Sequence, residues 1–110
     1  MFYRIFSPIG GDQPANAAKG SHLLNIGYEL FQTRNGEHGT KPIHRHGPNA
    51  GPIEGTVESV EKEFRDVLAK ARGEDGASRR ANAMKIGEIL KNGWNEDGAC
   101  TSELRRLLSV

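Results

Sequence analysis

Apolar residues in the second half of the chain lie along single faces of predicted helices. Thr56 is a good N-cap residue, and Gly73 is placed to end the helix that follows it. Between them apolar residues recur at steps of three and four: Val57, Val60, Phe64, Val67, Leu68 and Ala71. This spacing predicts an amphipathic helix that must cover another surface.

Two further helices are predicted toward the C-terminus. One runs over about 77–92 and is expected to turn four residues inward: Ala81, Ile86, Ile89 and Leu90. Trp94 is expected to pack near its end. The last helix carries Leu104, Leu107 and Leu108 on one face. Such one-sided helices are typical of the outer layer of an α/β domain, here one with very little sheet of its own.

The N-terminal part predicts one strand–turn–helix–strand unit. Residues 2–9 are rich in aromatic and β-branched types and predict a short strand ending at Pro8. Gly10 and Gly11 predict a tight turn. A helix with Pro14 at its first position is expected to end near Asn25, with Gly27 as its stop. Residues 28–32 predict a second short strand, which completes half of an α/β repeat.

Residues 33–55 predict a long loop. They hold five glycines, three prolines and three histidines among few apolar residues. His44 and His46 can chelate from an extended segment, but a metal site needs three or four ligands, so we expect a surface loop and no metal. Loops of this length in a compact domain are usually functional, disordered or insertions.

Composition excludes several classes of protein. Leu, Ile, Val and Phe make up 23 of 110 residues, which permits folding but only a thin core. A net charge of +1 gives no general attraction to nucleic acid. Cys100 is the one cysteine, so no internal disulfide forms and no nucleophile is indicated. No stretch is apolar enough for a membrane span or a signal peptide, so a cytoplasmic location is expected.

Several residues admit an ordinary structural interpretation. Asp12 is suited to cap the helix that follows it. The pairs Arg79-Arg80 and Arg105-Arg106 have acidic neighbours, so solvated helix faces are favoured over phosphate contacts.

Residues 8–18 read Pro-Ile-Gly-Gly-Asp-Gln-Pro-Ala-Asn-Ala-Ala. This segment resembles the end of the nucleotide-sugar-binding motif of UDP-dependent glycosyltransferases, the inverting enzymes of the GT-B fold. The downstream order of strand, variable loop and helices is also similar, so the resemblance covers nearly all of residues 8–108. The loop around residues 35–43 is similar to that of fungal members.

The resemblance implies an α/β fragment that is mostly helical, with one or two short strands and about four helices. It would be the C-terminal half of the Rossmann-like donor-binding lobe. Residues 1–110 would form a partial nucleotide-sugar-binding domain with three parts: 1–32 with the sugar motif, 33–55 as a loop insertion, and 56–110 as a helical layer. Asp12 and Gln13 match the pair that hydrogen-bonds donor-sugar hydroxyls. Gly10, Gly11 and Asn16 would support the turn.

The implied reaction is transfer of a hexose from a UDP-sugar, such as UDP-glucose, to a hydroxyl of a small-molecule acceptor. No other cofactor is implied. The family's His-Cys-Gly-x-Asn-Ser segment and its catalytic histidine have no match here, so no catalytic residue is assigned. We therefore expect an inactive fragment that docks to a missing N-terminal part. The alternative is a non-enzymatic helical module that docks on another protein through its apolar stripes.

Overall fold

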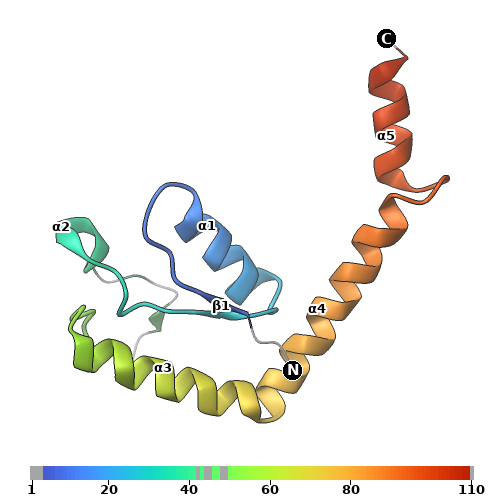
Figure 1. Ribbon diagram of the computed structural model, residues 1–110. Coiled ribbons are helices and arrows are strands. Elements are labelled where there is room, and N and C mark those ends of the chain that lie inside the picture. The colour runs from blue at the N-terminus through green and yellow to red at the C-terminus, as the bar shows by residue number, and fades with distance from the viewer. Residues whose placement is uncertain (1–3, 42, 44–45, 48–49, 110) are drawn as a thin grey trace.

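A computed structural model describes residues 4–41, 43, 46–47 and 50–109 of the chain (Figure 1). The elements in order are β1 (Ile5–Phe6), α1 (Gln13–Ala18), the π-helical segment η1 (Lys19–Leu23), β2 (Tyr28–Glu29), α2 (Gly36–Gly39), α3 (Val57–Arg72), α4 (Glu74–Gly93) and α5 (Ala99–Leu108). The predicted class, a mostly helical α/β fragment with short strands, is confirmed.

The two strands are parallel and form one small sheet. Ile5 pairs with Tyr28 and Phe6 with Glu29. The amide of Tyr28 donates to the Arg4 carbonyl at 2.9 Å, and the amide of Leu30 donates to the Phe6 carbonyl at 2.8 Å. Both strands are shorter than the sequence predicts, and residues 1–3 of the first lie outside the described part. Within that part each strand has a single neighbour, so the sheet extends no further.

Helices cover both sides of this small sheet. In Figure 1, α1 lies on one side of the strands and α3 on the other. The buried core joins the second strand to α3 through Tyr28, Leu30, Val67 and Ala71, with Ile5 packed against it. The part of the α3 stripe formed by Val67 and Ala71 therefore covers a sheet, as its spacing predicts, whereas Val57 and Phe64 in the same stripe are 70% and 40% exposed.

The first helix departs slightly from its prediction. It begins at Gln13, with Pro14 second, and continues into η1. Asn25, with φ 51°, follows the helical segment in the left-handed conformation expected of a helix end. Gly27 is not the stop. It lies against the first strand, where a Cβ atom would approach the Arg4 carbonyl oxygen to 2.7 Å, so close packing of two backbones explains this glycine.

The third helix matches its prediction closely. Thr56 and Ser59 form a capping box in which each side chain accepts from the other's backbone amide, at 3.1 and 3.0 Å. Gly73 ends α3 and also precedes α4, so α4 begins three residues earlier than the apolar pattern suggests. The predicted loop 33–55 contains the one-turn helix α2.

The C-terminal helices extend away from the strands. In Figure 1, α4 leaves the sheet region after its first turns and α5 continues outward. The radius of gyration is 17.6 Å, compared with about 13 Å for a compact chain of this size. Large apolar side chains stay exposed along this arm: Met84, Ile89, Leu90, Trp94, Leu104, Leu107 and Leu108.

The predicted inward packing of the α4 side chains is therefore wrong for several of them. Ala81, Ile89 and Leu90 are exposed, and Trp94, directly after the helix, is 62% exposed. The 3.6-residue period identifies an apolar stripe but does not supply the surface that would cover it.

In the described part of the chain, no helix is both long and apolar enough to cross a bilayer.

Candidate functional site

The glycine turn after β1 brings all the sequence-predicted site residues together. The amide of Gln13 donates to the Gly10 carbonyl at 3.2 Å, which closes a four-residue turn. Gly11 has φ +62°, a conformation that a side chain would strain. No atom lies within 4 Å of where a Cβ would stand on Gly10 or Gly11, so a ligand can approach this backbone closely.

Asp12 occupies the N-cap position of α1 but does not cap it with its side chain. Its backbone is near-helical, with φ −81° and ψ −8°, rather than in the extended conformation usual for a capping residue. Its Oδ2 atom instead accepts a hydrogen bond from Nδ2 of Asn16 at 3.0 Å. The capping interpretation is therefore wrong, and the exposed carboxylate is not committed to the helix end.

Gln13 folds back over the turn. Its Oε1 atom accepts from the backbone amide of Ile9 at 2.9 Å. An amide side chain has one acceptor oxygen and one donor nitrogen. Because the oxygen is engaged, Gln13 presents mainly its Nε2 donor to solvent, while Asp12 presents an acceptor. The turn follows the carboxyl end of a parallel strand, the usual ligand position in α/β folds.

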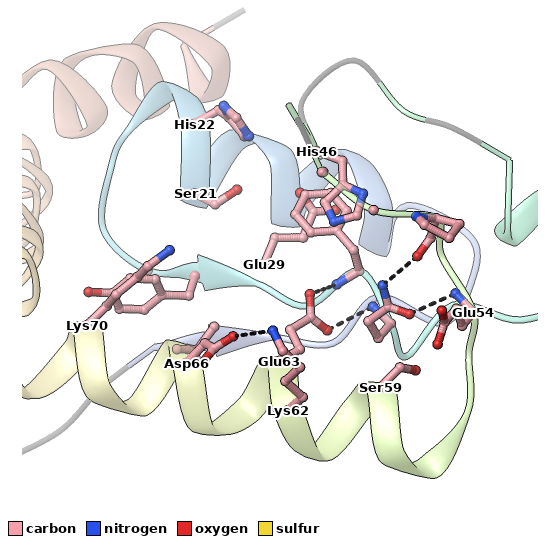
Figure 2. Close-up of a pocket in the computed structure, with 18 of the residues that line it drawn as sticks. Ser21, His22, Glu29, His46, Glu54, Ser59, Lys62, Glu63, Asp66 and Lys70 are labelled. Carbon is pink, nitrogen blue, oxygen red and sulfur yellow. Dashed lines mark hydrogen bonds and ion pairs between the residues drawn. The ribbon is translucent and has the colours of Figure 1, made fainter. Parts of the chain in front are cut away.

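A separate cavity of about 960 Å³ lies among η1, β2 and α3 (Figure 2). None of the sequence-predicted site residues lines it. Some of its charged groups are engaged: Lys62 forms an ion pair with Asp66 at 3.2 Å, and Glu63 and Arg79 form hydrogen bonds with backbone groups.

Glu63 on α3 holds the chain that leaves β2, a contact that no sequence pattern indicates. Its two carboxylate oxygens accept from the backbone amides of Phe31 at 2.7 Å and Gln32 at 2.8 Å (Figure 2). The Gln32 side chain in turn accepts from the amide of Glu54 at 2.8 Å and donates to the Pro52 carbonyl at 3.0 Å. These bonds close the base of the long loop beside the sheet.

Arg79 is a structural clamp, so its interpretation as part of a solvated helix face is wrong. Its guanidinium donates to the carbonyls of Gly27 at 2.5 Å and Ser21 at 3.2 Å, and its side chain is only 20% exposed. It also lies 4.4 Å from the centroid of the Tyr28 ring and donates to Asp75 at 2.9 Å. These contacts fix the start of α4 against the α1–β2 connection.

The same cluster changes the acidity of two groups. Burial, together with donation of the phenol to Asp75 at 2.5 Å, raises the pKa of Tyr28 to about 12. The Tyr28 hydrogen bond and the Arg79 guanidinium lower the pKa of Asp75, and its burial opposes that shift. Both pKa shifts therefore favour the state in which the Tyr28 phenol keeps its proton and the Asp75 carboxylate is ionised.

We expect the phenol of Tyr28 to titrate near pH 12 in the folded chain. The measurement is tyrosinate absorbance in a Tyr3→Phe background, where Tyr28 is the only tyrosine. A raised folded pKa stabilises the fold below pH 10, and this contribution is lost as the pH rises from 10 to about 12. Asp75→Asn should lower the midpoint of this titration but leave it above pH 10, because the Tyr28 phenol remains buried. A midpoint of 10 in the folded parent would contradict this account.

No group of three or more histidine, cysteine or acidic residues suited to a metal is found among residues 4–41, 43, 46–47 and 50–109. His46 stacks on the ring of Phe31, with centroids 4.3 Å apart. His44, the other histidine of the His44-x-His46 pair, lies outside the described residues.

Comparison with known proteins identifies one informative relative. The chain is 32% identical over 103 residues to the UDP-glycosyltransferase eriJ of Hericium erinaceus. The matched region covers 92% of this chain but 20% of the relative, so the chain spans about a fifth of that protein's length. No family model matches the chain, and no solved structure matches it. Over about nine-tenths of its length the chain is therefore similar to part of a fungal UDP-glycosyltransferase.

Proposed function

We propose that this chain is the donor-sugar-binding part of a UDP-dependent glycosyltransferase, equivalent to the C-terminal half of the nucleotide-binding lobe in a GT-B fold. The similarity to a fungal UDP-glycosyltransferase supports this origin. The observation that carries the site is the exposed carboxylate of Asp12, which stands at the helix start without capping it.

The chemistry of the turn suits a sugar with neighbouring hydroxyl groups. Asp12 accepts hydrogen bonds from hydroxyls, and Gln13 donates through Nε2 while its oxygen holds the turn. Hydrogen bonds to a charged acceptor are the stronger kind, so Asp12 is expected to supply most of the binding. The open backbone at Gly10 and Gly11 allows close approach of the sugar ring.

We expect the folded chain to bind UDP-glucose weakly and Asp12→Ala to weaken that binding about tenfold or more, as loss of a charge-assisted hydrogen bond predicts. The measurement is a titration followed by amide chemical shifts, with responses centred on residues 10–13. Asp97→Ala is the matched control because Asp97 is exposed and lies far along the chain, between α4 and α5. Equal affinities for parent and Asp12→Ala would contradict the assignment.

We also propose that this polypeptide binds the donor without transferring its sugar. No residue in the chain is assigned as the general base that would activate an acceptor hydroxyl. Incubation with UDP-glucose and simple acceptor alcohols should release no UDP above the rate without protein. Steady UDP release coupled to glycoside formation would overturn this proposal.

One observation favours the second candidate, a helical protein-interaction module. The arm formed by α4 and α5 exposes several large apolar side chains that folding alone does not bury. Absence of any response to UDP-glucose in a chain shown to be folded would favour this candidate over sugar binding.

A further inference from the structure

Asn16 lies one helical turn after Asp12, on the same face of the chain. Residues four apart in a helix are neighbours, and side-chain amides at this spacing form hydrogen bonds with acidic groups. Here the Nδ2 atom of Asn16 donates to Oδ2 of Asp12 at 3.0 Å. Both side chains are exposed, so the contact is not a product of core packing.

The Asp12 side chain has little else to hold it in the described structure. It makes no capping hydrogen bond to the helix amides. A surface carboxylate without a partner exchanges among rotamers, and each ligand that binds it must first restrict that motion. The Asn16 amide engages one oxygen, which limits the rotamers and leaves Oδ1 available.

We propose that Asn16 is a positioning residue that holds the Asp12 carboxylate ready to accept from a sugar hydroxyl. This inference rests on the proposed function for its ligand and on the 3.0 Å contact for its mechanism. Asn16 contacts Asp12 and would affect sugar binding only through the position of the Asp12 carboxylate. Its role is thus more specific than the support of the turn that the sequence suggests.

The first test needs no ligand. Three-bond side-chain couplings measured by NMR report the χ1 rotamer of Asp12 directly. We expect one dominant rotamer in the parent, averaging in Asn16→Ala, and recovery of a dominant rotamer in Asn16→Gln, whose amide also reaches a residue four positions away. Lys19→Ala is the control because Lys19 is exposed in the next turn. Identical Asp12 couplings in the parent and Asn16→Ala would overturn the proposal.

The second test uses UDP-glucose as the probe. Asn16→Ala should weaken its binding roughly two- to fivefold, since one exposed hydrogen bond is lost, and Asn16→Gln should regain part of that loss. Unchanged affinity in Asn16→Ala beside a tenfold loss in Asp12→Ala overturns the positioning role. A folded parent that does not respond to UDP-glucose overturns the proposed function instead, and the rotamer measurement then decides alone whether Asn16 positions Asp12.

Discussion

Gly76→Ala is expected to lower the free energy of unfolding by about 3 kcal/mol, at the upper end of the range for overpacked sites. Gly76 is buried in the first turn of α4, directly after the end of α3. A Cβ atom there would overlap the carbonyl group of Ala71, which is backbone and cannot rotate away. The α3–α4 junction must therefore shift, and the core residue Ala71 shifts with it. Chemical denaturation followed by circular dichroism measures the change.

Gly87→Ala in the same helix provides the matched control. No atom lies within 4 Å of the position that its Cβ would take, and the residue is exposed. Alanine in a helix interior is favoured over glycine by up to about 1 kcal/mol, so this variant should be more stable than the parent. The two substitutions are chemically identical, and the structure predicts effects of opposite sign. A Gly76→Ala variant as stable as the parent would show that α3 and α4 do not meet as described.

Glu63→Ala is expected to lower the free energy of unfolding by about 2–3 kcal/mol. It removes the carboxylate that accepts from the amides of Phe31 and Gln32 at 2.7 and 2.8 Å. Hydrogen bonds to a charged group contribute about 1.5–3 kcal/mol, and partly buried amides left without an acceptor add to the loss. Amide hydrogen exchange should show faster exchange at Phe31 and Gln32 before global unfolding, because the loop base opens locally.

Glu61→Ala is the control for this second prediction. Glu61 lies two residues earlier on the same helix and makes an exposed ion pair with Arg65 at 3.7 Å. Exposed pairs of this kind are worth little, so the change in unfolding free energy should stay within about 0.5 kcal/mol. The loss of unfolding free energy in Glu63→Gln should fall between the losses in Glu61→Ala and Glu63→Ala. The glutamine oxygen still accepts from one backbone amide, but its nitrogen is a donor and faces the other amide. Equal effects of Glu61→Ala and Glu63→Ala would contradict the bridging role.

The sequence predicted the helices well where their signals are local. The span of α3, its Thr56 cap and its Gly73 end follow from spacing and capping chemistry within a few residues. The start of α1 was predicted to within one residue for the same reason. The strands were predicted too long, because pairing depends on a partner strand that residue patterns within one segment do not reveal.

The roles of polar side chains were predicted less well. Arg79 looked like a solvated residue, yet it joins carbonyls more than 50 positions earlier in the chain. Glu63 carries no sequence signal, because any helix face holds similar acidic residues. Trp94 was expected to be packed and is exposed, since hydrophobicity shows only that a residue favours burial and not that a surface is present to bury it.

The sequence by itself determined the span and the apolar stripe of α3, the start of α1, and a glycine turn that places Asp12, Gln13 and Asn16 within one short segment. These features depend on hydrogen bonds between residues at most four positions apart. Only the tertiary structure decided that the strands run parallel and that Glu63 and Arg79 bridge distant backbone. Those outcomes depend on which groups compete for each donor and acceptor in space, and local periodicity contains no information about that competition.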